Sequence, residues 1–142
     1  NLQAALGLAQ LERLDEFITK KREMGRYYDS QFAGMGEFIL PPVQTVYAEN
    51  IYWVFGMVLS EKVPFDAEEM MARLSRLGVG ARPFFWGMHE QPVFNKLGWY
   101  LDHSYPVAGN IARRGFYIPS GLGITRQQQE RVVSVVLEAL AM

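Results

Sequence analysis

The 142-residue chain contains no cysteine, which excludes disulfides and thiolate metal sites and fits a cytoplasmic protein. No apolar run approaches the roughly 20 residues of a membrane-spanning helix, so we expect no membrane segment. Lys and Arg number 14 against 15 Asp and Glu, and this balance lacks the basic excess typical of a nucleic-acid surface. The 49% of apolar residues instead indicates one globular domain with its own core.

A helical pattern begins within one residue of the N-terminus. Apolar residues recur there at helical spacing, as Leu2, Ala5, Leu6 and Ala9. The spacing predicts one long helix over residues 2–32, which Gly34 ends. Because the helix opens so abruptly, we expect a fragment of a larger protein. Its connecting helix would cover about residues 1–33 and its small domain about residues 37–142.

Strands and helices alternate through the rest of the chain. β-Branched and aromatic residues predict strands over 50–59, 79–85 and 116–118. Asp66 with Glu69, and Thr125 with Gln128, have capping-box spacing for helices over 66–77 and 125–140. A further helix over 104–114 is predicted with Ser104 as its cap. We therefore predict an α/β chain of the α+β kind, in which a long N-terminal helix precedes a small three-stranded sheet packed with helices.

Short motifs along the whole chain carry a family resemblance. They are Leu2-Gln3-Ala4-Ala5, Glu49-Asn50-Ile51-Tyr52-Trp53, Arg82-Pro83-Phe84-Phe85, His89-x-Gln91-Pro92 and Ile118-Pro119-Ser120. In this order they resemble the C-terminal part of the DegT/StrS-type nucleotide-sugar aminotransferases, which are pyridoxal-phosphate enzymes of the aspartate-aminotransferase fold type I. The third and fourth motifs are most similar to the perosamine-synthase type. The resemblance implies the small C-terminal domain of such an enzyme, entered through its long connecting helix.

The resemblance also implies an activity for the parent protein. Perosamine-synthase-type enzymes aminate the C4 ketone of a GDP-linked 4-keto-6-deoxy sugar with glutamate as donor. Pyridoxal phosphate would be the cofactor, nucleotide sugar and glutamate the substrates, and a second copy of the protein the partner in a homodimer. In this family the Schiff-base lysine lies upstream. We therefore expect this chain to hold no cofactor covalently, to supply no catalytic residue and to be inactive alone.

The four lysines do not match the family's lysine motif. They are Lys20, Lys21, Lys62 and Lys96. The first three lie in charged or polar surroundings and are interpreted as solvated surface residues. The fourth lies in a more apolar stretch, but its neighbours differ from the motif as well.

Arg82 and His89 are the candidate substrate-binding residues. Arg82-Pro83 favours extended backbone at the end of a strand, and His89 follows in a loop. In the family this loop reaches the mouth of the active site, so the resemblance implies that both residues contact the sugar nucleotide. A guanidinium suits phosphate geometry. The alternative from the residues alone is that Arg82 pairs with a nearby carboxylate and His89 hydrogen-bonds the backbone.

Other polar groups fit structural roles. Asp102 and His103 precede Ser104, but sequence neighbours point in different directions, so we expect helix capping and no catalytic triad. Asp102, His103 and His89 also lack metal-ligand spacing, and we predict no metal site. Arg113 and Arg114 are interpreted as a solvated helix face. Two alternative functions stay open: a non-catalytic α/β module that binds a ligand or partner, and a dehydratase or regulator with the same fold.

Overall fold

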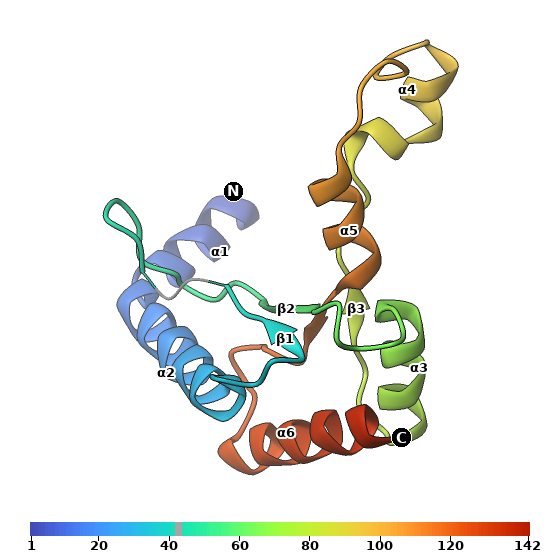
Figure 1. Cartoon of the computed structure of the whole chain (residues 1–142). Coiled ribbons are helices and arrows are strands. Elements are labelled where there is room, and N and C mark those ends of the chain that lie inside the picture. The colour runs from blue at the N-terminus through green and yellow to red at the C-terminus, as the bar shows by residue number, and fades with distance from the viewer. Residues whose placement is uncertain (42–43) are drawn as a thin grey trace.

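A computed structural model describes residues 1–41 and 44–142 of the chain (Figure 1). Its helices are α1 Leu2–Leu11, α2 Leu14–Phe32, α3 Ala67–Arg76, the 3-10 helix η1 Met88–Glu90, α4 Pro92–Lys96, α5 Pro106–Arg114 and α6 Arg126–Ala141. Its strands are β1 Phe38–Ile39, β2 Phe55–Leu59, β3 Arg82–Pro83 and β4 Gly115–Ile118. This mixed arrangement confirms the predicted α/β class. Within the described residues, no helix has the length and apolar character needed to cross a membrane.

The sheet has four antiparallel strands in the order β1-β2-β4-β3, where three were predicted. The additional strand is β1, whose Phe38 pairs with Leu59 of β2. Its two residues are too few to show a period-two pattern. The predicted strand over 50–59 forms only from Phe55, because the backbone before it is irregular and Tyr52 has a φ of 51°. The strand predicted over 79–85 likewise shortens to β3.

The predicted single N-terminal helix is divided into α1 and α2 at Glu12 and Arg13. The apolar spacing continues across the division, so it could not reveal the break. Asp15 and Glu16 lie in the first turn of α2, where acidic side chains stabilise a helix N-terminus, and Arg13 pairs with Glu16 at 2.9 Å. None of the residues of α1 is buried, whereas α2 packs into the core.

Helix caps were predicted correctly where the signal is local. Asp66 Oδ1 accepts the Glu69 N–H at 3.0 Å at the start of α3. The capping box of α6 is complete, with both bonds between Thr125 and Gln128 formed. The Ser104 prediction is wrong, because α5 begins after Tyr105 without a side-chain cap. Pro106 occupies the first turn there and needs no N–H acceptor.

The core lies between one face of the sheet and helices α2, α3 and α6. Alternate residues of β2 are fully buried, as Phe55, Met57 and Leu59, which is the period-two pattern of a strand with one apolar face. Tyr28 of α2 packs on the Phe55 ring with centroids 5.0 Å apart. One long segment of the chain, between β3 and β4, projects away from the body formed by the sheet and these helices (Figure 1).

Two buried tyrosines should make the fold sensitive to alkali. Tyr28 and Tyr52 are 0% and 1% exposed, and burial is the main cause that raises the pKa of both phenols above the usual 10.0. The folded state therefore keeps protons that the unfolded state releases, and stability should fall as pH rises above about 10. Urea midpoints at about pH 8 and about pH 11 measure this fall. Tyr28→Phe and Tyr52→Phe should each flatten it, and an unchanged slope in both variants would contradict the account.

Candidate functional site

Both candidate site residues belong to the segment between β3 and β4 or to its base. We call residues 84–114 the arm; it contains η1, α4 and α5, with α4 at its tip (Figure 1). The arm leaves the sheet after β3 and returns at β4, which are antiparallel neighbours. Its two ends are therefore held side by side by sheet hydrogen bonds.

Phe84 anchors the base of the arm. Its N–H donates to the Gly115 carbonyl at 3.1 Å. Its ring lies so close to two strand glycines that a Cβ on Gly56 or Gly115 would be 2.7 Å or 2.3 Å from ring atoms. Glycine at both positions thus makes room for the aromatic ring. The direction in which the arm leaves the sheet is fixed by this packing.

Arg82 lies in β3, opposite Tyr117 of β4, and is exposed. Its side chain makes no hydrogen bond or ion pair with any residue that the structure describes. Among the described residues, Arg82 therefore does not pair with a nearby carboxylate, which was the alternative considered from the sequence. An exposed guanidinium without an internal partner keeps all its donors available for an anionic ligand.

His89 lies in η1 and contacts a carboxylate. Its Nε2 is 3.3 Å from Glu90 Oε1, and its ring centroid is 4.8 Å from that of Tyr105. Only 18% of the side chain is exposed. Among the described residues, no backbone group forms a hydrogen bond with the His89 ring. The alternative role considered from the sequence, a histidine that hydrogen-bonds the backbone, is therefore not what holds this ring.

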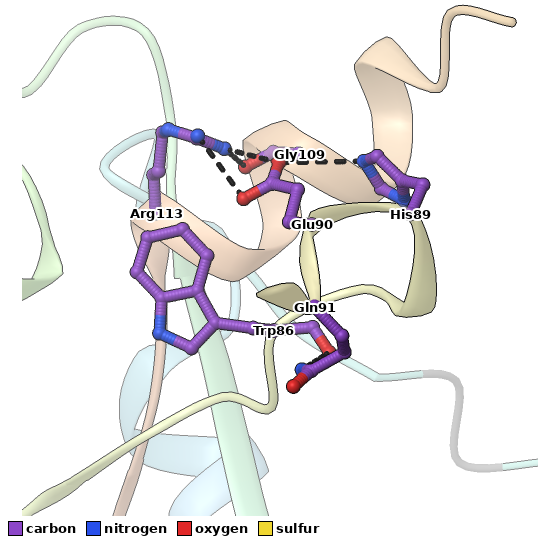
Figure 2. Close-up of polar contacts among 6 residues, drawn as sticks. All are labelled: Trp86, His89, Glu90, Gln91, Gly109 and Arg113. Carbon is purple, nitrogen blue, oxygen red and sulfur yellow. Dashed lines mark hydrogen bonds and ion pairs between the residues drawn. The ribbon is translucent and has the colours of Figure 1, made fainter. Parts of the chain in front are cut away.

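Glu90 and Arg113 complete the site, and sequence reasoning missed both. Arg113 Nη1 and Nη2 donate to Glu90 Oε1 and Oε2 at 2.8 and 3.1 Å, and Nη1 also donates to the Gly109 carbonyl at 3.1 Å (Figure 2). The guanidinium lies 5.1 Å from the centre of the Trp86 ring. This hydrogen-bonded pairing lowers the pKa of Glu90 and raises the pKa of Arg113. We call Trp86, His89, Glu90, Tyr105 and Arg113 the arm cluster.

No short-range signal in the sequence reveals the pairing of Glu90 with Arg113. The two residues are 23 positions apart and lie on η1 and α5, outside the strands. The interpretation of Arg113 as part of a solvated helix face was therefore incomplete, because its guanidinium is bound to the Glu90 carboxylate.

Arg114 was wrongly interpreted as solvated. Its guanidinium is half-buried and donates to three backbone carbonyls of the segment after β2, those of Leu59, Ser60 and Val63. The neighbouring arginines thus have different roles. Arg113 acts within the arm, and Arg114 joins the base of the arm to the body.

None of the four lysines forms a site suited to a Schiff base. Lys20 pairs with Glu16 at 2.7 Å, and Lys62 and Lys96 are exposed. Lys21, predicted to be solvated, is half-buried, and its ammonium donates to the carbonyls of Trp53 and Ser120. Burial lowers its pKa. Because this ammonium joins α2 to two loops, the residues present do not fit a covalently held aldehyde cofactor.

The remaining polar candidates do not form a reaction centre. His103 has a ring contact with Tyr105, at 6.2 Å between centroids. Among the described residues, no group of three His, Asp or Glu side chains is placed to hold a metal ion. A hollow of about 800 Å³ lies beside the N-terminal end of α6, and no residue of the arm lines it. The arm cluster is therefore a surface site.

Known proteins match this chain over almost its whole length. The sequence model of the DegT/DnrJ/EryC1/StrS aminotransferase family matches residues 1–137. A GDP-perosamine synthase of Caulobacter vibrioides is 27% identical over 140 residues, covering 99% of this chain and 37% of that protein. A dTDP-4-dehydro-2,6-dideoxy-D-glucose 3-dehydratase of Saccharopolyspora spinosa is 25% identical over 142 residues, covering 99% of this chain and 30% of that protein.

A solved structure shares the fold. The aminotransferase TlmJ from Streptoalloteichus hindustanus has a TM-score of 0.83 at 23% identity, over 97% of this chain and 36% of that one. The expected likeness to aminotransferases of fold type I is thereby confirmed. The chain spans about a third of the length of these proteins. Because the family's sequence model matches nearly every residue, the chain belongs to the DegT/DnrJ/EryC1/StrS aminotransferase family.

Proposed function

We propose that this chain is the C-terminal part of a larger pyridoxal-phosphate enzyme that aminates a nucleotide-linked 4-keto-6-deoxy sugar, with glutamate as the amino donor. The observation that carries the proposal is the family match over residues 1–137. The similarity to a GDP-perosamine synthase supports a GDP-linked sugar. We further propose a homodimer that acts in the cytoplasm. Residues 1–142 alone would not transaminate, because none of the four lysines is suited to hold the cofactor.

The proposed division of the chain is a connecting helix over about residues 1–33 and a small domain over about 37–142. Met24, Tyr28 and Phe32 on α2 are buried against the body, so the second half of the connecting helix shares the small domain's core. In contrast, none of the residues of α1 is buried. We propose that α1 packs on the remaining part of the complete protein.

Arg82 and His89 are the residues that we propose to contact the nucleotide sugar. Arg82 is exposed and unpaired within the described chain, so its planar guanidinium is free to bind a diphosphate oxygen pair. His89 lies at the start of the arm with one ring nitrogen turned toward Glu90. Its other ring nitrogen, Nδ1, has no hydrogen-bond partner among the described residues and is the atom available to a ligand.

Replacing Arg82 by alanine in the complete enzyme should weaken binding of the GDP-linked sugar about tenfold or more. A charge-assisted hydrogen bond contributes about 1.5–3 kcal/mol, and a factor of ten corresponds to about 1.4 kcal/mol. His89→Ala should have a similar effect. Isothermal titration measures the Kd, and thermal unfolding of the same samples measures stability.

The matched control is Arg76→Ala, which removes an exposed arginine from the last turn of α3, outside the arm, where it pairs with Glu69. It should leave the Kd unchanged. For Arg82→Ala we expect a change in stability of no more than about 0.5 kcal/mol. A loss of stability with an unchanged Kd would show that Arg82 is a structural residue.

The decisive experiment for the activity uses the complete protein with a GDP-linked 4-keto-6-deoxy sugar, pyridoxal phosphate and glutamate. Mass spectrometry should identify the amino sugar as product. The 3-dehydratase relative supports a second candidate, in which the same fold removes a sugar hydroxyl without adding nitrogen. A product that has lost one water and gained no nitrogen would establish that candidate. If the sugar is bound but unchanged, the chain is part of a non-catalytic binding protein.

A further inference from the structure

We propose that Glu90 and Arg113 are positioning residues that hold the His89 ring in the orientation in which it meets the nucleotide sugar. This inference rests on the proposed function of His89 and extends it to residues that the family resemblance did not indicate. Four features of the arm cluster support it: the fixed guanidinium, the shared carboxylate oxygen, the ring contact with Tyr105 and the placement of two glycines.

Arg113 is itself held from several sides. Its two terminal nitrogens bind both oxygens of Glu90, one of them also binds the Gly109 carbonyl, and the Trp86 ring lies 5.1 Å from the guanidinium carbon (Figure 2). A two-point pairing between a planar guanidinium and a carboxylate fixes the orientation of both groups. Residues 90 and 113 are 23 positions apart, so the pairing also joins η1 to the last turn of α5.

Glu90 transmits this fixed orientation to His89. The oxygen that accepts the 2.8 Å bond from Arg113 Nη1, Oε1, is also the atom 3.3 Å from His89 Nε2. Tyr105 adds a ring contact at 4.8 Å. With Nε2 facing the carboxylate, Nδ1 is the ring nitrogen without a partner among the described residues, and it is the one we assign to the ligand.

Two glycines make room for the arrangement. A Cβ on Gly87 would lie 2.5 Å from His89 Cε1 and 2.7 Å from Nδ1. Gly87 has φ −60° and ψ 150°, a conformation open to any residue, so the need for glycine comes from the approach of the ring and not from the backbone. A Cβ on Gly109 would lie 3.2 Å from Arg113 Nη1 and 3.4 Å from Glu90 Oε1. Glycine at position 87 is thus needed for the approach of the His89 ring, whereas at Gly109 a Cβ would only crowd the end of the Arg113 side chain slightly.

The test measures the KM for the GDP-linked sugar in the complete enzyme. Glu90→Gln keeps the shape of the side chain but removes its charge, and it should raise this KM roughly tenfold, because small misplacements of a binding group are costly. The half-reaction with glutamate should keep its rate. In a His89→Ala background, Glu90→Gln should have no further effect on KM, because it acts through His89.

The outcomes separate this inference from the proposed function. If His89→Ala raises KM and Glu90→Gln does not, the positioning role is wrong and the function of His89 stands. If Glu90→Gln raises KM equally with and without His89, the glutamate acts by itself and the positioning role is again wrong. If His89→Ala leaves KM unchanged, both proposals fail.

A glycine pair and a spectroscopic measurement provide independent checks. Gly87→Ala should displace the ring and raise KM as Glu90→Gln does, whereas Gly80→Ala, whose Cβ would meet no atom within 4 Å, should not. In the complete enzyme, the ring signals of His89 are those that disappear from the NMR spectrum of a His89→Gln variant. Glu90→Gln and Arg113→Ala should both shift these signals in the folded protein. Unchanged signals in both variants would overturn the proposal.

Discussion

The Gly25→Ala variant should lose about 3 kcal/mol of unfolding free energy, although helix propensity alone favours alanine by about 1 kcal/mol. Gly25 lies in α2, and a Cβ there would be 2.2 Å from Cγ of Tyr52 and within 2.5 Å of both neighbouring ring carbons. The Tyr52 ring is 1% exposed and stacks on Phe55 at 5.9 Å. Its phenol donates to Asp29. The alanine methyl group would push the Tyr52 ring out of this site, and the protein would lose the packing of that ring.

Urea unfolding measures the loss, and two further variants identify its cause. Gly80→Ala is the control: its Cβ would meet no atom within 4 Å, so it should not destabilise. Tyr52→Ala removes the ring that causes the clash. In the Tyr52→Ala background, Gly25→Ala should cost far less than in the original protein. Equal costs in both backgrounds would refute the packing account.

The same site shows why local sequence signals predicted some elements and not others. The caps Asp66 and Thr125 act over three residues, so the starts of α3 and α6 could be predicted. Tyr52 has a left-handed backbone, and its ring packs against Gly25 of α2, a residue far from it in the sequence. No window of the sequence contains both residues. The strand predicted over 50–59 therefore extended too far, even though its apolar half, β2, was correct.

The candidate site shows the same limit. Arg82 and His89 were predicted as site residues because they belong to short motifs with a family resemblance. Glu90 and Arg113 were not, because their pairing depends on how β3 and β4 align. Arg114 and Lys21 were misjudged for a related reason: charged residues usually lie in solvent, but these two donate to backbone carbonyls of segments distant in sequence.

Arg114→Ala should destabilise the protein by about 3 kcal/mol, because three carbonyls would lose a charged donor at once. Two of these bonds, to Leu59 and Val63, are 2.8 and 2.9 Å long, and the third goes to Ser60. The guanidinium is half-buried, so water replaces these bonds only in part. The turn between β2 and α3 should loosen first, and amide hydrogen exchange there should accelerate.

Arg113→Ala is the matched control, because it removes the same side chain one residue earlier in the same helical turn. Arg113 is 53% exposed and pairs with Glu90 at the surface, so its loss should leave the urea midpoint nearly unchanged. The two variants should therefore affect different properties. Arg114→Ala should lower the urea midpoint, whereas Arg113→Ala should raise the KM for the nucleotide sugar. Similar losses of stability in both would mean that the surface ion pair also supports the fold. A normal midpoint for Arg114→Ala would mean that water satisfies the three carbonyls.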